Sequence, residues 1–205
     1  NRPTRPGLST GYEVLDDVLG QGGIPCGQTT ELLGKPTSGM TTLAYRIIAS
    51  AHRQQQYAIY VDLESAFDPN YAAVCGVDLR QVFLARPDTE TAALEIARNL
   101  IEKGDVGIIV LDLGQTLPRM AQVRRLASSL SHSGCVVLML FSLREGMNPQ
   151  TVTHGSSAAL RLLIERDTWL TQHADIRGYR SQVLVFGRHS ASGKRVSIEI
   201  EIGTP

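Results

Sequence analysis

A glycine-rich segment, GKPTSGMTT at residues 34–42, has most of the residue types of a phosphate-binding loop. The usual pattern of such a loop is G-x-x-x-x-G-K-[ST]. Gly34 and Gly39 have the required spacing and Thr41 supplies the required hydroxyl, but Met40 stands where the lysine belongs. Backbone N–H groups in such a loop point toward one phosphate at the positive end of a helix. The segment therefore has the shape for phosphate binding but lacks the lysine at the position before Thr41.

Two acidic residues follow apolar segments that read as strands. Asp112 ends the run IIVLD, where it can hold Mg²⁺ through water while Thr41 supplies a hydroxyl ligand. Glu64 ends YVDLE and is placed to orient an attacking water. Acids at strand ends also commonly cap the next helix, so one of them alone is weak evidence. Together with the glycine loop, they favour a nucleotide-binding fold more strongly than they favour catalysis.

The segments that would position these residues alternate between apolar strands and amphipathic helices. We predict helices over residues 9–20, 41–53, 90–104 and 120–134. We predict strands over residues 29–33, 57–64, 82–85, 106–113 and 135–142. Continuous apolar strands separated by helices indicate a parallel sheet that is covered on both faces.

The end of the chain has a different pattern. Residues 181–203 read as two strands around a Ser/Gly turn. The second strand alternates polar residues with apolar ones, at Val196, Ile198, Ile200 and Ile202. This period of two is typical of an antiparallel hairpin with one face in water. The expected fold is therefore α/β: a twisted, mostly parallel sheet flanked by helices, with a C-terminal antiparallel β-hairpin.

Length and composition fit one domain over residues 1–205, with an extended lead-in at 1–10. The formal net charge is zero, so binding to nucleic acid would need a local basic patch. No apolar run approaches the roughly 18 residues of a membrane span. Three widely spaced cysteines fit a reducing, cytoplasmic setting, and the five histidines have no metal-binding spacing. The chain begins at Asn1, which leaves open whether its N-terminus was trimmed.

The order of these motifs resembles the RecA/RadA recombinase family. The family's opening segment and phosphate loop are similar to LSTGYEVLDDVLGQGGIPCGQTTELLGKPTSGMTTLA. Its catalytic-glutamate and adenine-contact segment is similar to YVDLESAFDPNYAAVCGVDL, and VFLARPDTETAALEIARNLIEKGDVGIIVLD continues to the second acidic motif. The resemblance is dense over residues 8–112, thinner to 203, and specific because several motifs keep the family's order. It implies a RecA-like P-loop ATPase core that uses ATP and Mg²⁺.

The resemblance also implies roles for individual residues. Glu64 matches the water-activating glutamate, Asp112 the magnesium aspartate and Thr41 the threonine of the phosphate loop, which Thr42 follows. With Gly34, Gly39 and Met40, these threonines would line the nucleotide phosphates.

Two further matches lie on the adenine side. Asp68 would accept a hydrogen bond from the adenine amino group, and Tyr71 would stack on the base. The alternative for Tyr71 is a half-buried tyrosine of a helix.

The sequence departs from the family at Met40. The loop lysine is a point charge on the β- and γ-phosphates, and methionine matches its length without its charge. Nucleotide affinity should fall, and stabilisation of the transition state should fall further. Lys35, five positions earlier, is either a solvated loop lysine or a substitute cation.

Three more departures concern DNA and the neighbouring subunit. Only LGQTLPRMA follows Asp112 before the next helix, so the family's first DNA-binding loop looks deleted. Ser142 stands at the position of the polar γ-phosphate switch, and the loop after it offers one arginine, Arg144. In VFGRHS, Arg188 and His189 stand nearest to lysines that reach the neighbour's nucleotide in the family. Arg188 is either that trans cation or an exposed arginine at a strand end.

Three functions are consistent with this pattern. The one favoured is an accessory or regulatory factor of recombination and repair that binds ATP and Mg²⁺ weakly and is not an efficient ATPase. Its partners would be another repair or recombination protein and, weakly, single-stranded DNA, with no membrane. The alternatives are an active recombinase that uses a substitute cation, and a signalling or scaffold module that does not bind nucleic acid. The partner's identity, the pathway and the oligomeric state stay open.

Overall fold

The computed structural model describes residues 7–104, 106–147, 158–172, 175–187 and 193–202. The helices within these residues are α1 (Glu13–Leu19), α2 (Met40–Arg53), α3 (Pro69–Val74), α4 (Glu90–Lys103), α5 (Met120–Leu130) and the 3-10 turn η1 (Leu79–Gln81). The strands are β1 (Thr29–Gly34), β2 (Ala58–Asp62), β3 (Val82–Ala85), β4 (Ile108–Asp112), β5 (Val136–Ser142), β6 (Leu160–Gln172), β7 (Asp175–Gly187) and β8 (Arg195–Glu201).

All these strands belong to one sheet in the order β3-β2-β4-β5-β1-β6-β7-β8. Neighbours from β3 to β6 pair in parallel, whereas the β6–β7 and β7–β8 pairs are antiparallel. The predicted α/β fold, with its mostly parallel sheet and C-terminal antiparallel hairpin, is confirmed. Strand β8 alternates between exposed and buried residues, as its sequence predicts.

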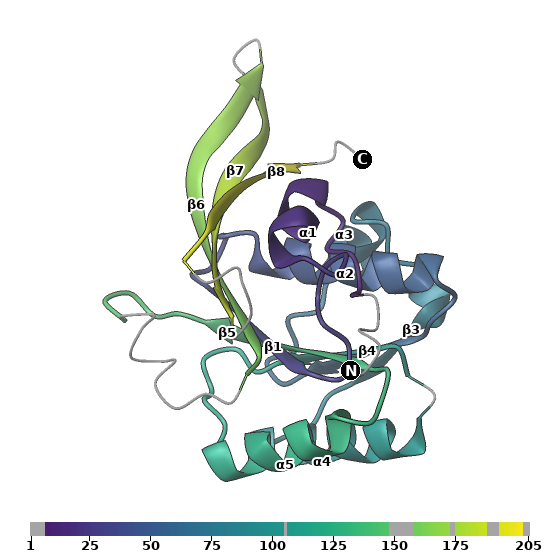
Figure 1. The fold of residues 1–205 in the computed structure, drawn as a ribbon. Coiled ribbons are helices and arrows are strands. Elements are labelled where there is room, and N and C mark those ends of the chain that lie inside the picture. Colours follow the sequence, from purple (N-terminus) through teal and green to yellow (C-terminus); the bar gives the residue numbers. More distant parts are fainter. Residues whose placement is uncertain (1–6, 105, 148–157, 173–174, 188–192, 203–205) are drawn as a thin grey trace.

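Helices cover both faces of the sheet. Helices α1, α2 and α3 lie on one face, and α4 and α5 lie side by side on the other (Figure 1). Each face has its own buried apolar cluster, one beneath α2 and one beneath α4 and α5. None of the helices in the described part of the chain is long and apolar enough to cross a bilayer.

Helix α4 shows how local signals set the boundaries. Thr89 caps its first turn, because the Thr89 hydroxyl accepts from the Ala92 N–H at 3.2 Å. Gly104 ends the helix with φ of 88°, a conformation that glycine adopts without a Cβ penalty. The predicted range therefore agrees with the observed one.

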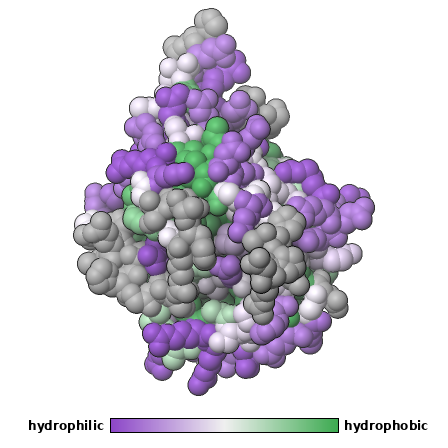
Figure 2. Space-filling view, in the orientation of Figure 1, coloured by the Kyte–Doolittle hydropathy of each residue, from purple (hydrophilic) through white to green (hydrophobic). Residues whose placement is uncertain are grey.

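Strand β6 is not among the strands that the sequence predicts. The sequence predicts no strand over residues 160–164, but these residues pair in parallel with β1 and begin a long strand. Beyond Ile164 most of the strand is exposed, so no apolar alternation marks it. Strands β6 and β7 project together from the body of the molecule (Figure 1). A hydrophobic patch lies below these two strands, where α1 meets β8 (Figure 2).

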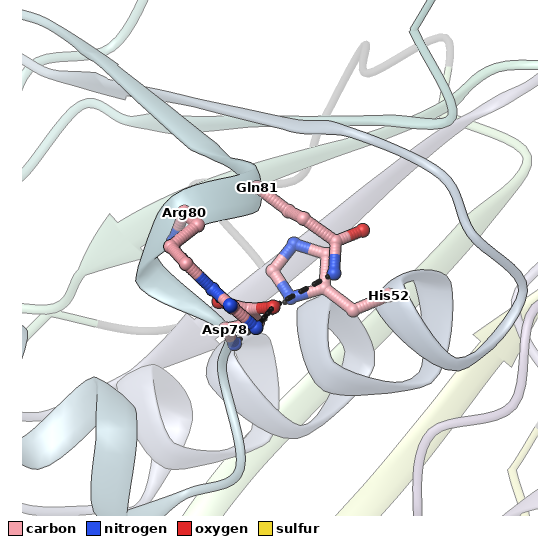
Figure 3. Close-up of polar contacts among 4 residues, drawn as sticks. All are labelled: His52, Asp78, Arg80 and Gln81. Atoms are coloured by element: carbon pink, nitrogen blue, oxygen red, sulfur yellow. Dashed lines mark hydrogen bonds and ion pairs between the residues drawn. The ribbon is translucent and has the colours of Figure 1, made fainter.

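A polar cluster fixes the C-terminal end of α2. His52 is buried, and its Nδ1 accepts from the Asp78 N–H at 3.1 Å (Figure 3). The Asp78 carboxylate accepts in turn from the side chains of Arg80 and Gln81. Burial lowers the pKa of His52, and the acceptor role of Nδ1 places the proton of the neutral ring on Nε2.

Candidate functional site

The predicted site residues gather at the carboxyl ends of the parallel strands. Strand β1 ends at Gly34, β2 at Asp62, β4 at Asp112 and β5 at Ser142. Gly34 lies opposite Ser142, and Asp62 lies opposite Asp112. In open α/β sheets, ligands bind at this edge. The fold therefore brings the glycine loop and the acids, which are far apart in sequence, to one edge.

The glycine loop has the predicted strand–loop–helix geometry. The Ser38 N–H donates to the Lys35 carbonyl at 3.1 Å, which closes a turn. Gly39 precedes the first residue of α2 with φ of 97°, and Thr37 has φ of 66°. Such left-handed conformations favour glycine and are strained for a β-branched threonine. Lys35 is exposed at the start of the loop.

Met40 is a core side chain. It is the first residue of α2, is 7% exposed and belongs to the buried apolar cluster on the α2 face of the sheet. Tyr179 and Ile200, from β7 and β8, belong to the same cluster. The loop position that carries a lysine in the usual pattern is thus occupied by an apolar group.

Asp112 is a desolvated carboxylate. It is 8% exposed and accepts from the Tyr60 hydroxyl at 2.7 Å. Burial raises the pKa of Asp112, and the negative charges of Asp62 and Glu64 raise it further, whereas the Tyr60 hydrogen bond lowers it. Burial and the adjacent Asp112 also raise the pKa of Tyr60, so its hydroxyl stays a donor. A nearby cation would favour the charged form of Asp112.

Asp62 lies beside Asp112, and the sequence analysis gave it no role. Its side chain is fully buried and accepts from the Ala66 N–H at 2.8 Å and the Phe67 N–H at 3.1 Å. Arg86 lies 3.4 Å from the same carboxylate. The sequence signal that could have identified Asp62 is an acidic residue at the end of an apolar strand. These contacts show that Asp62 holds the segment that follows β2.

Glu64 is exposed and turns toward the connection between β4 and α5. Its Oε1 accepts from the Gln115 N–H at 3.1 Å. A side chain at Gly114, which has φ of 56°, would overlap the Glu64 carboxylate. Arg144 Nε donates to Gln115 Oε1 at 2.6 Å. The short segment after β4 therefore contacts the glutamate that the resemblance assigns to water activation.

Asp68 and Tyr71, the predicted adenine-side residues, both have protein partners. Asp68 caps α3, because its carboxylate accepts from the N–H groups of Asn70 at 2.9 Å and Tyr71 at 3.1 Å. The Tyr71 hydroxyl lies 2.7 Å from Thr42 Oγ1, which brings α3 against the first turn of α2. Burial raises the pKa of Tyr71, and the Thr42 hydrogen bond opposes this shift.

Thr41 and Arg188 are the remaining residues that the sequence predicts at a nucleotide and Mg²⁺ site. Thr41 is half-buried in the first turn of α2, and Arg188 lies outside the described residues. Among the residues that the structure describes, no group of three His, Cys, Asp or Glu side chains could hold a metal ion. The oxygens of Thr41, Glu64 and Asp112 have the chemistry that hydrated Mg²⁺ prefers. Because Met40 is apolar and buried, however, the side chains that the structure describes do not fit a complete triphosphate site.

Two strands contribute residues that the sequence analysis missed. Ser181 of β7 donates from its hydroxyl to the Ser38 carbonyl at 2.7 Å. A Cβ at Gly39 would overlap the Ile200 side chain and lie 3.4 Å from Tyr179 Cε2. The alternation in β8 predicts that Ile200 faces inward but gives no sign of what it faces. No local pattern predicts these contacts.

A glycine loop at a helix N-terminus, beside acids at the ends of parallel strands, defines a RecA-like α/β core. The family model described as RecA N-terminal domain matches residues 4–123. Protein RecA of Acidothermus cellulolyticus is 33% identical over 214 residues, which are 90% of this chain and 62% of the relative. Protein RecA of Chloroflexus aggregans is 35% identical over 207 residues, 87% of this chain and 59% of the relative. Protein RecA of Cytophaga hutchinsonii is 34% identical over 227 residues, 96% of this chain and 64% of the relative.

The chain therefore belongs to the RecA family. It spans about three fifths of the length of these relatives.

Proposed function

We propose that this chain is an accessory or regulatory factor of DNA recombination or repair in which ATP binding and hydrolysis are impaired. The observation that carries the proposal is Met40, an apolar side chain packed in the core at the loop position of the phosphate-binding lysine. The role in recombination or repair rests on membership of the RecA family.

Electrostatics explain the expected loss of affinity. Asp62, Glu64 and Asp112 place negative charge at the edge where a triphosphate would bind. A lysine on the loop would offset this charge, and a charged hydrogen bond contributes about 1.5–3 kcal/mol. Without it, affinity should fall roughly 10- to 100-fold. Mg²⁺ near Thr41 and Asp112 would offset part of the loss.

The proposed partner is another repair or recombination protein, with weak binding of single-stranded DNA at most. The net charge of zero gives no long-range attraction to DNA. Arg144 is hydrogen-bonded to Gln115, which in turn donates to Glu64. Residual DNA binding should come from scattered cations and drop steeply with added salt. Anisotropy of a labelled oligonucleotide at two salt concentrations tests this; tight, salt-resistant binding that depends on ATP would contradict the accessory role.

Calorimetric titration with ATP, with and without Mg²⁺, tests the role of Met40. Met40→Lys should tighten ATP binding about 10- to 100-fold, because it restores a cation to the loop. Met120→Lys is the matched control, since Met120 is the first residue of α5 on the opposite face of the sheet. It adds the same charge and should leave ATP binding unchanged. Tight binding of Mg-ATP by the unaltered chain, with no gain from Met40→Lys, would contradict the proposal.

A further inference from the structure

The α1–β8 groove is a surface hollow between the start of α1 and strands β6, β7 and β8. Its volume is about 700 Å³, within the range of roughly 300–1,000 Å³ that is typical of ligand pockets. Neither the glycine loop nor Asp112 belongs to its described lining. The side chains that matter for its chemistry are Glu13 and Val14 from α1, and Asp167, Arg180, Ile198 and Glu199 from the strands.

The fold leaves an apolar surface uncovered in this groove. Val14 is 54% exposed, although the next residue, Leu15, is fully buried beneath α1. Ile198 of β8 also lines the groove. Figure 2 shows hydrophobic surface where α1 meets β8, with hydrophilic residues around it. An apolar patch with a polar rim is typical of an interaction site.

The charged groups in the groove are mostly carboxylates. Glu13, Asp167 and Glu199 line it together with one guanidinium, that of Arg180, which forms an ion pair with Glu199. Glu13 has no ion-pair partner in the described part of the chain. The lining therefore has two negative charges in excess, although the whole chain is neutral. Residues 8–34, which include α1, contain no lysine or arginine that could offset them.

This combination selects one kind of occupant. Carboxylates repel the phosphates of a nucleic acid, so DNA does not fit the groove. A lysine or arginine side chain fits both features, because its aliphatic stem packs on an apolar surface while its charged end reaches a carboxylate. A segment with apolar residues and at least two cations would cover Val14 and offset the excess charge.

A second copy of this chain is a poorer match. Its exposed arginines Arg124 and Arg125 lie on α5, but the apolar residues of that helix, Val123, Leu126 and Leu130, are buried against the sheet. Helix α5 therefore offers cations without an apolar side chain to place on Val14. The occupant that matches both features is a different protein.

We propose that the α1–β8 groove is the docking site for a basic, amphipathic segment of a partner protein. This inference rests on the proposed function, which gives the chain a protein partner, and it adds the chemistry by which that partner is recognised. The apolar residues of the segment pack on Val14 and Ile198. Its lysines or arginines pair with Glu13 and with the carboxylates of the strands.

The test uses a fluorescein-labelled peptide of leucine, lysine and arginine in an amphipathic helical order, and measures its anisotropy with the full chain. Glu13→Lys should weaken binding at least about fivefold, because it replaces an attraction by a repulsion. The matched control is Glu95→Lys, at an exposed glutamate of α4 on the other face of the sheet. It changes the net charge equally and should alter binding less than about twofold.

A second pair of variants tests the apolar contact. Val14→Ser should weaken binding about fivefold, since half of a valine side chain is no longer buried by the peptide. Val74→Ser is the control, at a valine of α3 that is 55% exposed. It should leave binding unchanged, and thermal denaturation checks that each variant folds. A peptide with glutamate in place of every cation should not bind.

Three results would overturn the docking site. The first is an equal loss for Glu13→Lys and Glu95→Lys, which would mean attraction to the overall charge. The second is a neutral Val14→Ser. The third is self-association, measured by light scattering, that Glu13→Lys abolishes, which would make a second copy the occupant. Robust ATP turnover would instead contradict the proposed function and would leave the peptide measurements unchanged.

Discussion

The acidic half of the site, formed by Asp62, Glu64 and Asp112, differs from the loop half, residues 34–42, in what holds it together. Each acid accepts a hydrogen bond from a protein group, and Asp62 and Asp112 are buried. In the loop half, apolar and tyrosine side chains from α3, β7 and β8 pack where a ligand would bind.

This difference suggests why the acidic half keeps the family's acids whereas the loop half keeps its glycines and Thr41 but not the lysine. A buried carboxylate that accepts backbone N–H groups contributes to the fold, so replacing it is costly whether or not the site is used. A loop lysine contributes mainly to ligand binding and little to the stability of the fold. An apolar side chain of similar length can replace it and gain core contacts. The acids alone are therefore poor indicators of activity.

The largest effect should come from Asp62→Ala. It leaves the Ala66 and Phe67 N–H groups without their acceptor, at a cost of about 2–4 kcal/mol in the free energy of unfolding. Asp17→Ala, at an exposed acid of α1, should cost less than about 0.5 kcal/mol. Urea denaturation measures both. Equal effects would show that the acidic half has no special structural role.

Gly114→Ala should disturb the contact between the acidic half and the segment after β4. Its positive φ costs about 1 kcal/mol for alanine, and displacement of the Glu64 carboxylate adds to this cost. Gly104→Ala isolates the backbone effect, since Gly104 has φ of 88° and, among the described residues beyond its own helix, no atom lies within 4 Å of the added methyl group. Thermal denaturation should show the larger loss for Gly114→Ala, and Glu64→Ala should restore part of it. Equal losses at the two glycines would contradict the contact.

Ser181→Ala tests the loop half. Removing the donor to the buried Ser38 carbonyl should cost about 1 kcal/mol in the free energy of unfolding. Ser197→Ala, at an exposed serine of β8, should be neutral. Chemical denaturation of the two variants measures the difference. A neutral Ser181→Ala would mean that β7 does not hold the loop.

The smallest effect concerns His52, at the opposite end of α2 from the loop. Because the pKa of His52 is lower in the folded chain, the unfolded chain binds more protons as the pH falls through about 6.5. The contribution of neutral His52 should be present at pH 7 and decline toward pH 5. His52→Gln, which keeps an acceptor for the Asp78 N–H, should remove this part of the pH dependence. If the unaltered chain and His52→Gln show the same pH dependence of the free energy of unfolding, the assigned role of His52 is wrong.

The sequence predicts most of the fold because alternating apolar strands and capped helices are local signals. Residues 160–164 do not read as a strand because the exposed polar half of β6 hides the pattern. The order of motifs also places Glu64 and Asp112 at the same edge of the sheet. The contacts of Tyr179 with Gly39 and of Ser181 with Ser38 could not be predicted, since the partners lie more than 100 residues apart in the sequence. The sequence shows that position 40 lacks a charge, but it does not show that the Met40 side chain packs in the core.

The most direct test of the central claim is steady-state hydrolysis of ATP by the purified chain with Mg²⁺, with and without single-stranded DNA. The account predicts no turnover above that of the Glu64→Gln variant, because the buried, apolar Met40 stands where the usual loop lysine would contact the phosphates. Robust turnover that Glu64→Gln abolishes would show that a substitute cation completes the site and would contradict the account.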